Sequence, residues 1–542
     1  MRPPRSPISS PRSFVGRFAD RSPAGSSRPQ WRGSERHPAR GSNQVAGPHA
    51  VGHWLGAALV GLVVLGLAFV PSSVWAGELQ AGAATSNITP PLGADIIGGF
   101  TPYPATHVHD ELHARCLVLD NGTHRLAIVV CDLLGLHYAV SREARRLITQ
   151  HTGLPPGQVL ICATHTHTAA SALGPPGYLV EIELDEYQRF VAGRIADGVR
   201  RAIQLLRPAE LAWGRVSIPE HVFNRRWHLR AGAMTPNPFG ELDLVRMNPP
   251  AGSDTLVEPA GPVDPDLTFL AVRDAGGAPL ALWASYSLHY VGGERRGDIS
   301  ADYYGLFCEE LARLMTPQPV TSESLPTPAG APPFVAMLSN GTSGDVNNIN
   351  FRQPRAATGP YVRMRDVAHD VARKVHQATE GLEWSRSVAL DSRYRELSLA
   401  RREPTAERRQ WATEVLARAP ADRGKWDLPT IYADRVLKLS AGPTEYPLPI
   451  QVLRIGTGVV GTMPHEVFAE IGLEFKERCG PGPAQLTSLA HGYYGYLPTP
   501  RQHDLGGYET WLGTNRVERD ASVKLLAGLL ELHRELAPPT QP

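Results

Sequence analysis

The sequence predicts an α/β protein, with a mixed sheet, helices packed on its faces and a single large domain. Apolar, strand-like runs alternate with helical patterns of about 10–15 residues, the alternation that builds layered α/β or α+β folds. The chain has 542 residues, of which 42% are hydrophobic and 20% charged, with a formal net charge of +1. This composition suits a globular protein and excludes a disordered acidic chain or a basic nucleic-acid binder.

Each element follows from its local pattern. Apolar runs bounded by turn residues predict strands at 113–120, 126–132, 158–163, 267–272, 280–286, 334–338, 448–455 and 486–489. Apolar residues at helical spacing predict helices at 140–151, 304–315 and 362–379, a helix after His465, and a closing amphipathic helix over 517–536. The first four elements form a strand–helix–strand unit that ends in a histidine-rich turn.

The N-terminal region differs from the rest of the chain. Residues 1–53 hold nine arginines and no lysine against two carboxylates, amid proline, serine and glycine, and are predicted to be disordered. An apolar run and a small-x-small site follow, so 54–76 is predicted to be a signal peptide or an uncleaved anchor. The protein is therefore expected to be exported, to the periplasm, the cell surface or the medium. The predicted domain is 77–542, whose mild negative charge gives no reason to seek a nucleic-acid partner.

The strongest local signal is the segment THTHT at 164–168, directly after the apolar run VLICA. In an extended segment residues i and i+2 point to the same side, so His165 and His167 are expected to face one point. A strand end is also where α/β folds place their sites. A pair of hydrogen-bonded surface histidines is the alternative.

Two further ligand types stand at other strand ends. His289 closes the apolar run WASYSLH, and Glu466 lies in MPHE between an apolar strand and a helix. Two or three imidazoles with a carboxylate form a common zinc set that leaves a position for water, whose pKa zinc lowers to about 7. The five cysteines form no C-x-x-C pair, so a thiolate metal site is not expected.

Five stretches resemble the neutral/alkaline non-lysosomal ceramidase family, in the family's order. They are THTH, WASYSLH, SNGTSGDV, MPHE and YYGYLPT with a Gly-Tyr-Glu about ten residues on. The resemblance runs from about residue 81 to 536 and implies one catalytic zinc per chain. Carried over to this sequence, its ligands are His165, His289, Glu466 and Tyr496.

The resemblance also implies roles for residues that do not bind the metal. His167 takes the place of a histidine that polarises the substrate or stabilises the oxyanion. Asn224 and Arg225, in FNRR, resemble an Asn-Arg pair whose guanidinium lies near the active site, so Arg225 is expected to help stabilise the oxyanion and Asn224 to contact the substrate. A surface salt bridge is the alternative for Arg225.

The chain departs from the family pattern in two places. Asn347 stands where ceramidases carry a serine after Gly-Asp-Val. An amide is no nucleophile, but it can donate a hydrogen bond to a carbonyl or oxyanion, so Asn347 is expected to orient the substrate. Asp345 either holds the loop by an Asx-type turn or contacts the substrate. The chain also ends soon after the Tyr496 region, so the family's C-terminal immunoglobulin-like domain is expected to be absent.

Together these features predict an exported zinc-dependent amidohydrolase that cleaves an N-acyl amide, ceramide or a related N-acyl lipid, with zinc-activated water. Its partner would be a lipid or other small-molecule substrate, with contact to a membrane surface left open and no protein partner expected. The alternatives are a zinc-holding binding protein without catalytic power, and a zinc hydrolase of a non-lipid amide or ester. Fold likeness does not choose among substrates.

Overall fold

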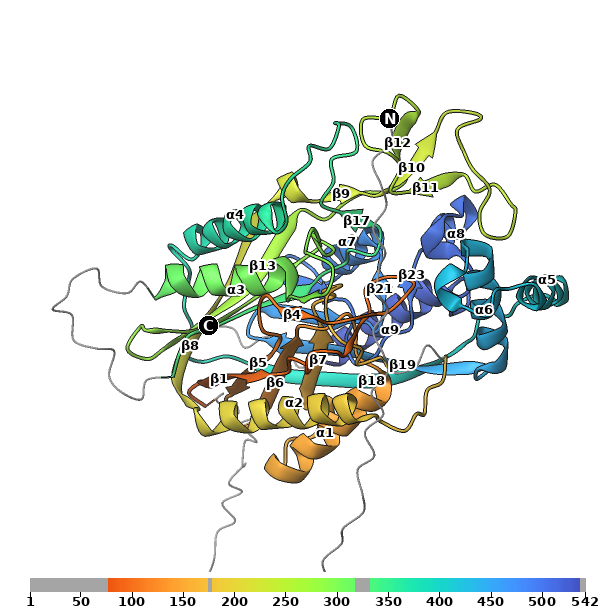
Figure 1. Cartoon of the computed structure of the whole chain (residues 1–542). Helices are drawn as coiled ribbons and strands as arrows, with labels where there is room; N and C mark the ends of the chain where they lie inside the picture. Colours follow the sequence, from red (N-terminus) through yellow and green to blue (C-terminus); the bar gives the residue numbers. More distant parts are fainter. Residues whose placement is uncertain (1–76, 174–177, 317–331, 537–542) are drawn as a thin grey trace, which may run out of the picture. The chain divides into compact units, whose positions relative to one another are not determined.

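An eight-stranded mixed sheet forms the centre of the structure, a computed structural model that describes residues 77–173, 178–316 and 332–536 (Figure 1). Its strands lie in the order β16, β14, β13, β8, β1, β5, β6, β7. In that order their bounds are Val335–Asn340, Pro279–Tyr286, Asp266–Asp274, Arg207–Ser217, Gln80–Asn87, His113–Asp120, Arg125–Cys131 and Val159–Ala163. The pairs β14–β16 and β6–β7 are parallel and the others antiparallel, so the sheet is mixed, as predicted.

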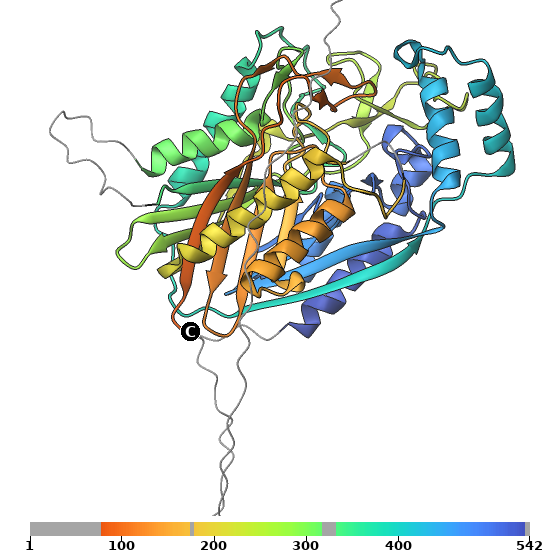
Figure 2. The ribbon, with the colours of Figure 1, turned by 60° about the horizontal axis from the view of Figure 1, so that its bottom comes forward.

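Alternation along the strands divides the apolar residues of this sheet between two cores. In β5, Cys116 and Val118 face one core with the helices α1 (Tyr138–Thr152) and α2 (Glu186–Gln204). Leu117 and Leu119 face the opposite core. Figure 2 shows α1 and α2 lying along the strands. On the other half of the sheet α3 (Asp302–Met315) and α4 (Val362–Ala378) form a third core. Successive side chains of a strand point to opposite faces, so both faces of this sheet are buried.

A second, four-stranded sheet covers the face opposite α1 and α2. It is built in the order β18 (Leu390–Ala400), β19 (Glu445–Ile455), β20 (Gly458–Thr462), β22 (Ala484–Thr487). Leu453 and Ile455 of β19 join the core shared with the large sheet, whereas Leu448, Ile450 and Val452 face another core. That core includes α6 (Leu428–Ala441), α7 (Ala469–Arg478) and α9 (Ala521–Glu535). The order of layers is therefore helix, sheet, sheet, helix.

Short segments complete the fold around the site. The antiparallel pair β9 (Phe223–Asn224) and β17 (Val346–Asn347) and the parallel pair β21 (Glu466–Val467) and β23 (Tyr496–Leu497) bring distant residues together. A three-stranded sheet holds β10 (Arg226–Leu229), β11 (Val245–Met247) and β12 (Leu256–Pro259). The pairs β2–β3 (Asp95–Ile96, Tyr103–Pro104) and β4–β15 (His107–Val108, Asp298–Ile299) lie in loops, and the remaining helices are α5 (Ala406–Ala417) and α8 (Pro500–Leu505).

Every predicted element is present, with bounds that shift by a few residues, and the predicted mixed α/β class is confirmed. The sequence patterns missed β1, β8, β18, α2, α5 and α6. β1 has the sequence QAGAATSN and consists mainly of small residues. The helix α2 crosses this strand so closely that a Cβ at Gly82 would lie 2.1 Å from the carbonyl oxygen of Ala202. Small residues are required there, and they carry little strand signal.

No helix within these ranges is long and apolar enough to cross a lipid bilayer. The predicted disordered tail at 1–53 and the predicted signal peptide or anchor at 54–76 lie outside the described residues.

Candidate metal centre and its cavity

Three histidines meet where strands of the large sheet end. His165 and His167 follow β7 and His289 follows β14, and their ligand atoms all lie within 4.8 Å of one another. The extended geometry expected for His165 is wrong, because this residue has a positive φ of 78°. The chain turns there, and the turn brings Nε2 of His165 to 3.2 Å from Nε2 of His167. The two imidazoles therefore converge through a bend and not through strand alternation.

Each imidazole is oriented by a backbone carbonyl behind it. Nδ1 of His165 lies 2.7 Å from the oxygen of Leu134, Nδ1 of His167 lies 2.7 Å from that of Gly98, and Nδ1 of His289 lies 3.0 Å from that of Ser343. Only a protonated Nδ1 can donate to a carbonyl, so the lone pair of each neutral ring is on Nε2. This is the orientation that metal-binding histidines adopt.

Burial keeps two of these rings neutral. It lowers the pKa of His167 well below its usual value, and the neighbouring His165 adds to that effect. Burial also lowers the pKa of His289, to which the positive charge of Arg225 contributes. Neutral imidazoles are the form that binds a metal ion.

The contact between Nδ1 of His167 and the carbonyl of Gly98 requires glycine at position 98. A Cβ at that position would lie 2.0 Å from the carbonyl oxygen of His167.

Glu466 supplies a carboxylate at the same point. It follows β20 and begins β21, and its Oε2 lies 3.3 Å from Nε2 of His165 and 3.6 Å from Nε2 of His289. The other oxygen, Oε1, accepts a hydrogen bond of 2.7 Å from the hydroxyl of Tyr493. Burial alone would raise the pKa of Glu466, but positive charge beside it, on the facing imidazoles or on a cation held between them, and the hydroxyl of Tyr496 lower it far below its usual value. The carboxylate is therefore ionised.

Tyr496 stands beside Glu466 because the two short strands β21 and β23 pair in parallel, with these residues directly opposite each other. Its ring is buried and lines the same cavity as the three histidines. The guanidinium carbon of Arg225 lies 5.3 Å from the ring centre. All four residues that the family resemblance implies as ligands thus gather at one place.

This group of residues fits a bound cation. Oε2 of Glu466 is buried and makes no hydrogen bond, while unprotonated Nε2 atoms surround it. Electron pairs that face one another at 3.2–3.6 Å repel unless a positive charge lies among them. Bonds of about 2.0–2.1 Å in a tetrahedral zinc site place neighbouring ligand atoms about 3.3 Å apart. The donor types and their spacing therefore suit zinc.

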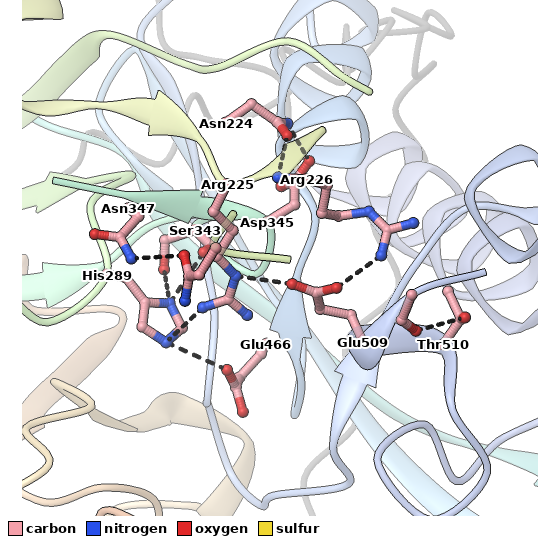
Figure 3. Close-up of polar contacts among 12 residues, drawn as sticks. Asn224, Arg225, Arg226, His289, Ser343, Asp345, Asn347, Glu466, Glu509 and Thr510 are labelled. Atoms are coloured by element: carbon pink, nitrogen blue, oxygen red, sulfur yellow. Dashed lines mark hydrogen bonds and ion pairs between the residues drawn. The ribbon is translucent and has the colours of Figure 1, made fainter. Parts of the chain in front are cut away.

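Arg225 lies next to this group and is held by a buried carboxylate (Figure 3). Its Nε donates to Oε1 of Glu509 at 2.8 Å, and Nη1 of Arg226 donates to Oε2 of the same carboxylate at 2.7 Å. Nη1 of Arg225 is 3.5 Å from Nε2 of His289, and its Nη2 is buried without a hydrogen-bond partner. One donor of Arg225 is thus free to bind a substrate atom.

Asn224 and Asp345 lie behind Arg225 and do not line the cavity. Nδ2 of Asn224 donates to Oδ2 of Asp345 at 2.9 Å, and Oδ1 of Asp345 accepts from the backbone nitrogen of Ala469 at the start of α7. Burial raises the pKa of Asp345 to about 7. Their hydrogen bonds fix β9 against the loop that precedes β17 and against α7. This matches the loop-holding role offered for Asp345 and leaves the substrate contact expected for Asn224 a prediction.

Asn347 is also absent from the cavity wall. It is partly exposed, and its Nδ2 donates to Oδ1 of Asn248 at 3.1 Å. Asn248 itself lines the cavity, so position 347 lies one side chain away from it. In this arrangement the amide of Asn347 bonds to Asn248 and does not face the cavity, where a direct contact with the substrate was expected.

The cavity above the candidate metal centre has a volume of about 880 Å³. It lies between the large sheet and α6, and aromatic and apolar side chains form much of its wall, among them Phe100, Tyr178, Leu179, Met234, Trp426, Leu428, Ile431, Tyr508 and Trp511. This size and lining suit an organic molecule with a sizeable apolar part.

The sequence patterns missed three residues of the site. Tyr493 donates to Glu466, Tyr290 stacks on His167 with ring centres 3.7 Å apart, and Glu509 holds Arg225. Glu509 belongs to the Gly-Tyr-Glu stretch that the family resemblance includes, which was a signal for it. Tyr290 directly follows His289, and no pattern distinguished it from a core aromatic.

We expect Glu509→Gln to lower the free energy of unfolding by about 2 kcal/mol, because both guanidiniums then lose a charged partner. Urea denaturation followed by tryptophan fluorescence measures the change. Glu531→Gln is the matched control, since Glu531 forms an exposed ion pair with Arg395 that contributes little. An equal effect of the two substitutions would contradict the importance of the buried pair.

No protein-family model matches this sequence, and no curated protein matches it significantly. The structure, however, has the fold of the solved neutral ceramidases. The neutral ceramidase from Pseudomonas aeruginosa is similar over 86% of this chain and 76% of its own, with a TM-score of 0.59 and 18% identity. A ceramidase complexed with C2 is similar over the same shares, with a TM-score of 0.61 and 17% identity. These likenesses confirm the fold that the five motifs predicted.

Proposed function

We propose that the protein is an exported, zinc-dependent hydrolase that cleaves the amide bond of an N-acyl lipid. The observation that carries the proposal is the set of unprotonated Nε2 atoms and one unpaired carboxylate oxygen facing one point in a large, mostly apolar cavity. The ceramidase fold supports an acyl amide as the substrate. Export rests on the apolar segment 54–76.

We assign the metal to His165, His289, Glu466 and Tyr496. A bound zinc ion would supply the Lewis acidity that activates water and polarises the acyl carbonyl. Tyr493 fixes Glu466 through Oε1, which leaves Oε2 for the metal. The carbonyls of Leu134 and Ser343 fix the two imidazoles in the matching orientation.

The chain's own groups supply the proton transfer and the charge stabilisation. Because Nδ1 of His167 donates to Gly98, its Nε2 is free to accept a proton from the attacking water and to pass it to the amine nitrogen. As the C–O bond to water forms, the acyl oxygen gains negative charge, which the free Nη2 of Arg225 can stabilise. The C–N bond then breaks, and a carboxylic acid and an amine are released.

The alternative of a binding protein without catalytic power rests on Asn347 in place of a serine. Asn347 bonds to Asn248 and does not line the cavity, whereas every group in the mechanism above comes from another position. The substitution therefore removes no group that this mechanism uses.

The proposal is tested by metal content and turnover. We expect about one zinc per chain by mass spectrometry of the metal, loss of amide hydrolysis after treatment with a chelator, and recovery with Zn²⁺ but not with Mg²⁺. The substrates are a fluorescent ceramide, a fluorescent N-acylethanolamine and a p-nitrophenyl ester of the same chain length. Zinc without turnover would favour the binding protein, and turnover of the ester alone would overturn the amide assignment.

A further inference from the structure

Three arginines of the cavity wall, Arg246, Arg435 and Arg516, have no carboxylate partner among the described residues, and the last two lie beside the same tyrosine, Tyr178. Arg435 comes from α6 and Arg516 from the segment before α9, and both line the cavity above the metal centre. Nη1 of Arg435 donates only to neutral oxygens, at 3.3 Å to the hydroxyl of Tyr432 and at 3.2 Å to Oγ1 of Thr514. Nη1 of Arg516 has a long contact of 3.4 Å to the carbonyl of Tyr493, and its Nε is buried without a hydrogen-bond partner.

Both arginines lie beside Tyr178, Arg516 with its guanidinium and Arg435 with the stem of its side chain. The guanidinium carbon of Arg516 lies 4.6 Å from the ring centre of Tyr178. The hydroxyl of Tyr178 donates to the carbonyl of Gly513, where an added Cβ would lie 2.8 Å from Cβ of Arg435. Arg435 also lies over the ring of Phe100, with 5.1 Å between its guanidinium carbon and the ring centre. Aromatic faces position both cations but do not neutralise them.

None of the three carboxylates of the cavity wall forms an ion pair with Arg435 or Arg516 in the described part of the chain. Asp434 is already paired with Arg423 and Lys438, each at 2.8 Å. Asp243 accepts hydrogen bonds from Trp511 and Asn237 and forms no ion pair. The remaining carboxylate of the wall, Glu466, belongs to the metal centre, where Arg225 is the neighbouring cation and already bonds Glu509.

A partly desolvated guanidinium without an anion is costly, and a ligand that brings the anion recovers that cost. The planar fork of arginine matches the oxygens of a carboxylate, sulfonate or phosphate. We propose that the amide substrate carries such an anionic oxygen group, a carboxylate foremost, which binds Arg435 and Arg516. The inference deepens the proposed function and rests on it: N-acyl amino acids, and not neutral amides such as ceramide, are the class of substrate that this cavity selects.

The test compares two amides that differ in charge alone. N-decanoylglycine carries a carboxylate where N-decanoylethanolamine carries a neutral hydroxymethyl group. We expect the wild-type protein to prefer the glycine amide at least about tenfold in kcat/KM, and Arg435→Gln and Arg516→Gln each to reduce that ratio about tenfold. Arg519→Gln is the matched control, because Arg519 is an exposed arginine paired with Asp504, and it is expected to keep the ratio.

A binding measurement separates this inference from the hydrolase itself. Decane-1-sulfonate has the anionic oxygens but no amide bond, and it is a poor zinc ligand; decan-1-ol is its neutral counterpart. Calorimetric titration is expected to show at least about tenfold tighter binding of the sulfonate, lost in Arg435→Gln and Arg516→Gln.

Sulfonate preference without any amide turnover would uphold the anion site and overturn the hydrolase. Amide turnover with no preference for charge in either assay would overturn the anion site and leave the hydrolase standing. Equal binding of both decane compounds together with no turnover would overturn both.

Discussion

His289→Ala is expected to reduce bound zinc from about one ion per chain to almost none and to lower kcat/KM by roughly a thousandfold or more. The imidazole contributes one of the few Nε2 donors at the site, and the metal's Lewis acidity is worth several kcal/mol of transition-state stabilisation. The remaining donors would face one another without a complete coordination shell. Metal analysis by mass spectrometry and amide hydrolysis by the same protein sample measure both effects.

His167→Ala is the matched control for this experiment. Its Nε2 lies 3.2 Å from that of His165, so it belongs to the same cluster, yet we propose proton transfer and not metal binding as its role. Zinc is therefore expected to stay bound in His167→Ala while turnover falls by roughly a hundredfold or more. Loss of zinc in His167→Ala and its retention in His289→Ala would exchange the two assignments.

Arg225→Ala is expected to lower kcat by roughly a hundredfold to a thousandfold while zinc content stays unchanged. The free Nη2 of Arg225 is the donor proposed for the developing oxyanion, and the loss of one such donor typically has this effect. Steady-state kinetics with a fluorescent amide give kcat and KM separately, and the fall is expected in kcat.

Chemical rescue tests whether Arg225 acts directly. Added guanidinium is expected to restore part of the lost rate in Arg225→Ala, because the cavity left by the side chain still holds the carboxylate of Glu509 that binds Nε. Arg519→Ala provides the control for a surface arginine, with no loss and no rescue. Unchanged kcat in Arg225→Ala would exclude it from the reaction.

The candidate ligands could be predicted because each one belongs to a local pattern. His165, His289 and Glu466 each follow an apolar run, and those runs are the strands β7, β14 and β20. A strand end is recognisable from a few residues, since β structure shows its alternation and burial locally. Which strand ends meet could not be predicted in this way, because β14 lies six places from β7 in the large sheet. Contacts of β16 with β5, β6 and β7 show that the sheet curls until its two ends approach each other.

The supporting residues could not be predicted by spacing. Arg225 and Glu509 are 284 residues apart in sequence and 2.8 Å apart in space. Asn347 stands in a motif whose spelling suggested a substrate contact, yet its amide turns to Asn248. Side-chain partners of this kind depend on loops whose paths no periodicity describes.

By itself, the amino-acid sequence determined the α/β class, most of the strands and helices, and the residue types that gather at the candidate metal centre, because hydrophobic periodicity and short motifs are local properties of the chain. Only the tertiary structure decided the order of the strands, the bend that turns His165 toward His167, and the meeting of Tyr178, Arg435 and Arg516 in one cavity wall. The physical reason is that these features arise when whole layers pack, and packing joins side chains with no regard to their separation along the chain.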